Sequence, residues 1–186
     1  SNHSFIKEKI SDLSKSIPFL IWITRPDGKT PSIGDSEEKI VSHSLTQKLA
    51  PQYYEEINEG MRVFSNGYAI WRYVNPQLHF TLKSCHFGRF HRHDDDCSIT
   101  LWYKGENLIL DSGLLYYQEK DPKRIYIRSP LAHSGFEIPG KTPLRNFSDK
   151  RTKNSTVQKL SDNEIRSTLG MYSNVKVSRK VSKNEL

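Results

Sequence analysis

The sequence predicts a mainly β protein, an antiparallel β-sandwich preceded by a short helical segment. Apolar residues recur at helical spacing in parts of residues 1–60, whereas several later segments alternate apolar and polar side chains, as strands do. The turn signal Lys104-Gly105 between two such segments predicts a hairpin. We therefore expect residues 1–60 to form a helical lead-in and residues 61–186 to form the sheet domain.

The lead-in is expected to contain two helices and a connection between them. Residues 4–17 have apolar side chains near helical spacing, and Pro18 is expected to limit this helix at its C-terminal end. Residues 24–36 contain three turn signals, and a second helix is expected from about 46 to 58, with Gly60 as its C-cap. The connection should be ordered, because its apolar neighbours need burial: Ile21, Trp22, Ile23 and Ile33.

The sheet domain should consist of strands rich in β-branched and aromatic residues. The clearest are expected at residues 68–73, 78–83, 98–103 and 107–111, and further strands at 123–128, 134–138 and 174–181. Residues 143–163 are polar and are predicted to be loop. The last strand has no evident partner after it, which suggests a fragment of a longer protein.

Charge and composition restrict the class of partner. The net charge is +7 and the isoelectric point about 9.3, values that favour a polyanion but also fit a solvated, lysine-rich surface. Zinc-finger spacing and an RNA-binding aromatic signature are absent, so nucleic acid is not expected, and no apolar run is long enough to span a membrane. Cys85 and Cys97 are expected to be free thiols, although a disulfide between neighbouring strands is an alternative.

Three histidines and one aspartate suggest a metal site. His91 and His93 would lie on the same face of a strand, and Asp111 follows a segment that reads as a buried strand, where a carboxylate needs a cation or hydrogen-bond donors. His133 is expected at the start of another strand. Imidazole nitrogens with a carboxylate oxygen suit Zn²⁺. Any one of these histidines alone would more often be an ordinary surface or core residue.

Several of these segments resemble the C-terminal sheet domain of heparinase II/III-type polysaccharide lyases. The resemblance is carried by His91-Arg-His93-Asp-Asp95, by Leu110-Asp111-Ser-Gly113 and by Arg128-Ser-Pro-Leu-Ala-His133. Weaker matches lie upstream, at Pro31-Ser-Ile-Gly34-Asp35 and around Gly67, and downstream at residues 172–179. Arg92, Ser112 and Ser134 depart from the family pattern, which has Gly, Pro and Asn at these positions.

The resemblance implies a role for each site residue. His93, Asp111 and His133 would hold a structural zinc ion, and Asp95 would orient a ligand or its loop. His91 would face the substrate groove as a catalytic residue together with Tyr117, for which Tyr116 and Tyr126 are alternatives. Positive charge for a carboxylate or sulfate group would come from three arginines: Arg92, Arg124 and Arg128.

The implied reaction is β-elimination on an acidic polysaccharide that contains uronic acid. The family's other catalytic groups lie on an N-terminal α/α toroid, of which the helical lead-in would be the remnant, and the sandwich would be the supersandwich-like domain that follows it. Secretion or placement in the periplasm or cell envelope is expected from the family. The alternative is a non-catalytic glycan-binding or assembly module that keeps the zinc site for stability.

Overall fold

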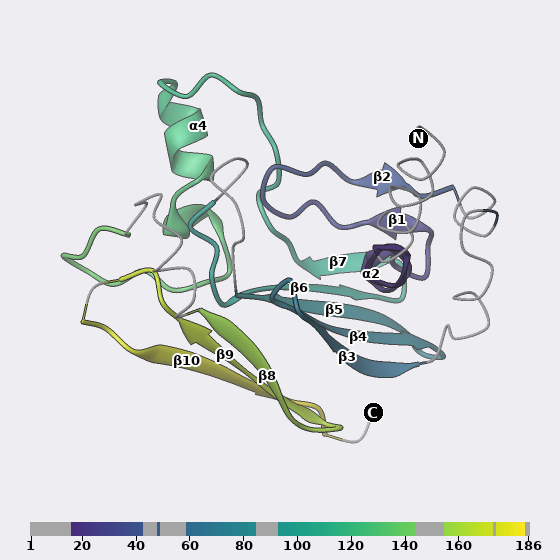
Figure 1. Cartoon of the computed structure of the whole chain (residues 1–186). Helices are drawn as coiled ribbons and strands as arrows, with labels where there is room; N and C mark the ends of the chain where they lie inside the picture. The colour runs from purple at the N-terminus through teal and green to yellow at the C-terminus, as the bar shows by residue number, and fades with distance from the viewer. Residues whose placement is uncertain are drawn as a thin grey trace, which may run out of the picture.

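The computed structural model describes residues 16–42, 48, 59–84, 93–143, 155–172 and 174–184. Within these ranges the protein is mainly β, as predicted, with strands arranged in antiparallel sheets (Figure 1). The large sheet is a meander of β3 (Gly60–Phe64), β4 (Tyr68–Val74), β5 (Gln77–Lys83), β6 (Ser98–Tyr103) and β7 (Glu106–Ile109). A second sheet has the order β10-β9-β8 and comprises β8 (Thr156–Ser161), β9 (Glu164–Leu169) and β10 (Val177–Ser182).

The two sheets pack face to face and enclose the main apolar core. Ala69, Trp71, Phe80 and Leu82 of the large sheet form one buried cluster with Ile165 of β9. Apolar side chains alternate along β4 and β5, so one set of residues points toward the second sheet. The sandwich architecture therefore follows from burying this face of the large sheet.

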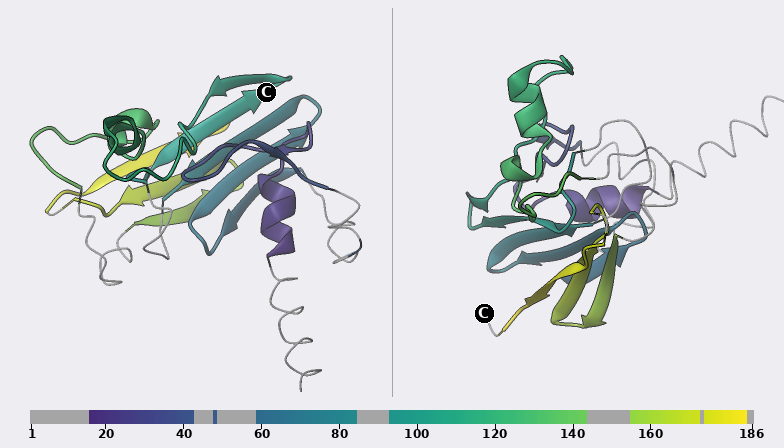
Figure 2. Two further views of the ribbon diagram at one scale, coloured as in Figure 1. Left: turned by 90° about the horizontal axis from the view of Figure 1, so that it is seen from above. Right: turned by 90° about the vertical axis from the view of Figure 1, so that its left-hand side faces the viewer.

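The opposite face of the large sheet is covered by α2 (Ile17–Ile23) and by the chain around the short pair β1 (Lys29–Thr30) and β2 (Lys39–Ile40) (Figure 2). Ile21 and Trp22 of α2 pack there against Ile70 of β4. Toward β5 and β6 this face becomes polar, and its side chains include His79, Thr81, Lys83, Ser98 and Thr100, all buried. A buried polar face needs hydrogen-bond partners. His79 bonds the Trp22 carbonyl oxygen, Thr81 and Thr100 bond each other, and Lys83 and Ser98 contact carboxylates of the candidate site described below.

The four clearest strand predictions are confirmed as β4, β5, β6 and β7. The predicted hairpin between β6 and β7 is also confirmed, and its turn residues Lys104 and Gly105 have φ values of 48° and 93°. The burial expected for Ile21, Trp22, Ile23 and Ile33 is found. The strand expected at 174–181 is β10, which pairs with the strand before it, β9.

Three other local predictions concern Pro18, Gly60 and residues 123–128. Pro18 lies in the first turn of α2, where a proline needs no hydrogen-bond donor, and the helix at 4–17 that it was expected to end falls outside the described residues except at 16 and 17. Gly60 begins β3, and the helix that it was expected to cap falls outside the described residues. The strand prediction at 123–128 was wrong. Residues 123–128 form a helix, α4 (Pro122–Ile127), because the Asp121 side chain accepts a hydrogen bond from the Lys123 amide and Pro122 fits the first turn.

Two further segments differ from prediction near the C-terminus. Residues 134–138 form turns and irregular chain instead of a strand, and Phe136 and Ile138 pack beside the buried Cys97. Part of the predicted loop 143–163 is β8, which pairs with β9 around a turn at Asp162 and Asn163. Most of β8 is exposed to solvent, so its sequence is polar and does not show the apolar alternation that predicts a strand.

Some predictions fall outside the described residues: the helices at 4–17 and 46–58 (apart from residues 16, 17 and 48), Cys85, His91 and Arg92. Cys97 is a buried free thiol, and burial raises the pKa of this thiol. Among the helices in the described part of the chain, none has both the length and the apolar content needed to cross a bilayer.

The free energy of unfolding should decrease as the pH is lowered, because of the buried side chain of His79. This residue of β5 forms a hydrogen bond with α2. Its imidazole is 1% exposed and its Nε2 lies 2.9 Å from the Trp22 carbonyl oxygen, so the neutral ring donates this hydrogen bond. Burial lowers the pKa of His79 from 6.5 to about 4. Between pH 6.5 and 4 the unfolded chain binds a proton that the folded chain does not, which removes up to about 3 kcal/mol as the pH falls.

This pH effect can be measured by urea unfolding at pH 7 and pH 4.5. His79→Gln keeps an amide donor for the Trp22 carbonyl oxygen but cannot titrate, so its free energy of unfolding should change less between these two pH values than that of the wild type. All other histidines are common to both chains and cancel in the comparison. Equal pH dependence in the two chains would show that His79 does not contribute.

Candidate metal centre and adjoining hollow

The fold brings together the three residues that the family resemblance implies as zinc ligands. His93, Asp111 and His133 each offer a nitrogen or oxygen atom, and these atoms all lie within 4.8 Å of one another. The centroids of the two imidazole rings are 5.2 Å apart. His93 and Asp111 are buried, and the side chain of His133 is fully buried. Three potential ligands from separate parts of the sequence thus share one buried position.

Each of these residues is placed by a loop or an element end. His93 lies in the loop before β6 and not on a strand, and the amide of the next residue, Asp94, donates to the Arg128 carbonyl oxygen at 2.9 Å. Asp111 follows β7, an exposed edge strand rather than the buried one expected. His133 follows the 3₁₀ helix η2 (Pro130–Ala132), not the start of a strand, and its amide donates to the Pro130 carbonyl oxygen at 3.2 Å.

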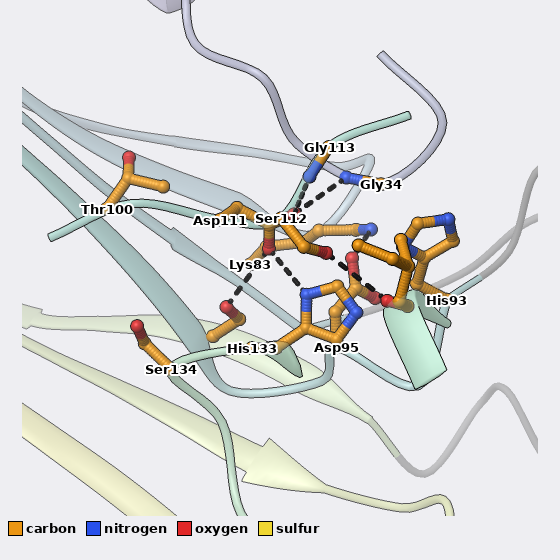
Figure 3. A network of polar contacts seen from close by, with 12 residues as sticks. Gly34, Lys83, His93, Asp95, Thr100, Asp111, Ser112, Gly113, His133 and Ser134 are labelled. Carbon is orange, nitrogen blue, oxygen red and sulfur yellow. Dashed lines mark hydrogen bonds and ion pairs between the residues drawn. The ribbon is translucent and has the colours of Figure 1, made fainter. Parts of the chain in front are cut away.

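Asp111 is the centre of a hydrogen-bond network (Figure 3). Its Oδ1 accepts from the amides of Gly34 at 3.2 Å and Gly113 at 3.1 Å, and its Oδ2 accepts from His133 Nδ1 at 2.8 Å. The Ser98 hydroxyl makes a longer contact with Oδ2, at 3.5 Å. These are all donors, as an ionised carboxylate requires. The network therefore meets the need for donors or a cation that the sequence indicated.

Gly113 is essential to this geometry. Its φ is +62°, and a Cβ atom there would lie 2.8 Å from Ser32 Cβ and 3.0 Å from the Ser36 carbonyl oxygen. Both the backbone conformation and the close approach of the Ser32–Ser36 segment exclude a larger residue. The glycine of the Asp111-Ser-Gly113 motif thus allows the segment before the sheet domain to close over Asp111.

Asp35, which the sequence analysis did not assign to the site, contacts His93. Its Oδ1 lies 2.7 Å from His93 Nε2 and 2.6 Å from Arg124 Nη2. Burial acts to raise the pKa of Asp35, but the hydrogen bonds from His93 and Arg124 outweigh it and lower the pKa. Burial lowers the pKa of His93, which favours the neutral ring, the form in which histidine binds metals.

A buried ion pair between Lys83 and Asp95 lies on the sheet side of the site. The Lys83 ammonium group contacts Asp95 Oδ2, and the two side chains are 10% and 0% exposed. Burial opposes the charge on Lys83, but the negative charge of Asp95 raises the pKa of Lys83 above its ordinary value. Asp95, expected to orient a ligand or its loop, thus holds a cation from β5 close to the ligand set.

The buried groups fit a zinc-type cation. Nδ1 of His93 and Nε2 of His133 are buried without a hydrogen-bond partner in the described part of the chain, and such nitrogens are costly unless they bind something. Two neutral imidazoles and a carboxylate form a borderline nitrogen and oxygen donor set. The surrounding network contains three carboxylates and two cationic side chains: Asp35, Asp95 and Asp111, and Lys83 and Arg124. An added cation would meet net negative charge.

An open hollow of about 430 Å³ adjoins this cluster. Tyr117, Lys83 and Asp35 line it, with Tyr68 and the Ile33–Ser36 segment. Tyr117 is 56% exposed, and the Arg124 guanidinium lies 5.6 Å from the centre of its ring. This places Tyr117 beside a concave surface whose lining includes one cationic and one acidic side chain, Lys83 and Asp35. The two alternative tyrosines are also placed: Tyr116 hydrogen-bonds Asp121, and Tyr126 is 54% exposed on α4.

The predicted substrate-binding arginines occupy different environments. Arg124 is 1% exposed and bonded to Asp35, so its burial does not support direct contact with a substrate. Arg128 is 21% exposed and forms an ion pair with Glu119. His91 and Arg92 lie outside the described residues.

The chain is similar in sequence and in fold to known proteins. Residues 59–185 match the family described as heparinase II/III-like, C-terminal. No curated protein sequence matches the chain significantly. Solved structures with a similar fold include the heparinase III BT4657 gene product (TM-score 0.70, 19% identity) and the heparan sulfate lyase HepC from Pedobacter heparinus (TM-score 0.65, 21% identity). Each match covers 94% of this chain.

A further structure titled heparinase III has a TM-score of 0.63 and 17% identity, over 90% of this chain. At such identities the structural likeness establishes the fold. The chain spans about 30% of the length of these solved proteins. The family match covers well over half of the sequence, and it includes all three clustered residues, His93, Asp111 and His133. The chain therefore belongs to the heparinase II/III-like C-terminal family.

Proposed function

We propose that this chain is the sheet domain of a polysaccharide lyase that cleaves a uronic-acid-containing acidic polysaccharide. One observation carries the proposal: the buried cluster of His93, Asp111 and His133 lies beside an open hollow lined by Tyr117 and Lys83, within a domain of this family. The similar structures include proteins titled heparan sulfate lyase and heparinase III, and these names indicate acidic polysaccharide substrates for those proteins. The net charge of +7 suits an anionic polymer.

The reaction is β-elimination. A base removes the proton at C5 of the uronic acid, the bond from C4 to the leaving oxygen breaks, a double bond forms between C4 and C5, and the leaving oxygen takes a proton. The C5 proton is weakly acidic, so nearby positive charge must stabilise the negative charge that develops on the carboxylate. Tyr117 and His91 are the proposed proton-transfer groups.

Two cationic side chains lie on the hollow side of the site, and each is paired with a carboxylate. Lys83 lines the hollow and pairs with Asp95, and Arg124 lies over the Tyr117 ring while bonded to Asp35. Arg128 and Arg92 are still proposed to contact a carboxylate or sulfate group of the substrate. Arg124 is instead proposed to hold Asp35 and the Tyr117 ring in place, because its guanidinium is buried in the protein.

Zinc is the proposed resident ion, held by His93, Asp111 and His133. When bound, it would link three segments that have little regular structure of their own: the loop before β6, the end of β7 and the turn after η2. This is a structural contribution, since binding free energy becomes folding free energy. The chain's own residues, not the ion, perform the proton transfers in this proposal.

The 186-residue chain alone is expected to have little or no lyase activity. It corresponds to about 30% of the length of the similar solved proteins, and the proposed remaining catalytic groups belong to an N-terminal α/α toroid of the longer protein. The test is to incubate this chain, and separately the longer protein that contains it, with heparin-like, heparosan, alginate and capsular polymers. The ultraviolet absorbance of unsaturated products measures turnover.

The longer protein should turn over at least one of these polymers, and the chain alone should turn over none. Rapid product formation by the chain alone would show that the toroid is not needed. If the longer protein bound a polymer without cleaving any, the lyase proposal would be wrong and a glycan-binding module would be favoured.

A further inference from the structure

The turn between β1 and β2 contacts two of the three proposed ligands. The amide of Gly34 donates to Asp111 Oδ1 at 3.2 Å, and the next residue, Asp35, lies 2.7 Å from His93 Nε2. This turn precedes residues 59–185, the part of the chain that matches the family. A segment outside the matched domain thus reaches into the centre of its buried cluster.

The turn is fixed rather than loosely placed. Arg25, which is 3% exposed, contacts Asp27 and Glu38 on the β1–β2 segment, each at 2.8 Å. The same guanidinium donates to Asn107 Oδ1 of β7 at 3.0 Å and lies 5.7 Å from the centre of the Trp102 ring. These contacts tie the β1–β2 segment to the strands that lead into Asp111.

The contacts of His93 determine which ring nitrogen faces the cluster. The Asp35 carboxylate can only accept a hydrogen bond, so this 2.7 Å contact needs the hydrogen on Nε2 and the lone pair on Nδ1. Arg124 Nη1 lies 3.4 Å from the same Nε2, where the guanidinium could only donate, but the much shorter contact with Asp35 favours the Nε2–H form. The positive charge of Arg124 would also repel a metal ion at Nε2. Nδ1 is buried and has no hydrogen-bond partner within the described ranges.

We propose that Asp35 is a positioning residue for the metal centre. It holds His93 in the Nε2–H form and directs Nδ1 toward the ion, Arg124 holds Asp35, and Gly34 of the same turn orients Asp111. Carboxylate groups that orient a metal-bound histidine typically account for about 10- to 100-fold in metal affinity. This inference rests on the proposed zinc site and adds to it that the segment before residue 59 completes the site.

The experiment measures the zinc affinity of the 186-residue chain by competition with a chromophoric chelator. Asp35→Asn should bind zinc about 10- to 100-fold more weakly than the wild type. Glu37→Gln is the matched control: it removes the same charge two residues away, where the carboxylate is exposed and pairs with Lys39. Its affinity should equal that of the wild type, and Asp35→Glu should recover part of the loss.

A second measurement does not depend on zinc binding. Nitrogen-15 chemical shifts of the His93 ring in the zinc-free wild-type chain should show the hydrogen on Nε2, and Asp35→Asn should lose this preference. A hydrogen on Nδ1 in the wild type, or an unchanged zinc affinity in Asp35→Asn, would overturn the role of Asp35 alone. Failure of the wild type to bind zinc would instead overturn the proposed metal centre, and this inference with it.

Discussion

Replacing His93 by alanine is expected to leave the chain without bound zinc and to lower its thermal midpoint by about 10 °C. A ligand present at 1,000 times its Kd stabilises the folded state by about 4 kcal/mol, and each kcal/mol shifts the midpoint of a domain of this size by about 2–4 °C. The site joins three separate loops, so loss of the ion loosens all of them. Elemental analysis of the purified chain and thermal unfolding with and without added zinc measure the two effects.

His91→Ala is the matched control for this prediction. The family resemblance places His91 toward the substrate, so this variant should retain zinc and the wild-type midpoint. A chelator should lower the midpoint of the wild type and of His91→Ala, but not that of His93→Ala. Zinc loss in His91→Ala with retention in His93→Ala would mean that the two histidines have exchanged roles. Retention in both would remove His93 from the ligand set.

The large sheet could be predicted because its sequence carries two consistent signals. Alternation of apolar side chains defines β4, β5 and β6, and Lys104-Gly105 supplies the positive φ angles of the hairpin turn. The second sheet was harder to predict. β8 has an exposed, polar surface, and its pairing with β9 is visible in the sequence only as the turn residues Asp162 and Asn163.

The error at α4 has a specific physical cause. The sequence Arg124-Ile-Tyr-Ile127 has the β-branched and aromatic content of a strand, but Asp121 and Pro122 supply an N-cap and a preformed first turn. These capping contacts outweigh residue preferences that differ by only a few tenths of a kcal/mol per residue. Arg124 points from this helix into the protein, where it meets Asp35. Because this segment is a helix and not a strand, Arg124 is buried against Asp35, and its expected contact with substrate is not supported.

The grouping of the ligand residues could be inferred from motifs, whereas their environment could not. Asp35 and His93 are 58 positions apart and meet through tertiary contacts, among them the hydrogen bond from Arg25 to Asn107 of β7. Lys83 reads in the sequence as the polar end of an ordinary strand, yet its side chain is buried against Asp95. Such contacts arise from tertiary packing, and sequence spacing does not encode them.

Replacing Tyr117 by phenylalanine in the longer protein is expected to lower the rate of polysaccharide cleavage by about 10²- to 10⁴-fold, the usual contribution of one proton-transfer group. The change removes one hydroxyl group and keeps the ring beneath the Arg124 guanidinium. Because Tyr117 is 56% exposed, zinc content and thermal stability should stay at their wild-type values. The rate of appearance of unsaturated product, measured with saturating polymer, tests the prediction.

Tyr116→Phe is the control that makes this result specific. Tyr116 is the adjacent residue and has the same hydroxyl group, but it hydrogen-bonds Asp121 at the start of α4, whereas Tyr117 lines the hollow. Its replacement should leave the cleavage rate nearly unchanged. A large loss in Tyr116→Phe with none in Tyr117→Phe would move the proton-transfer role by one residue. If neither variant lost activity, the hollow beside the ligand cluster would not be the place where the C5 proton is removed.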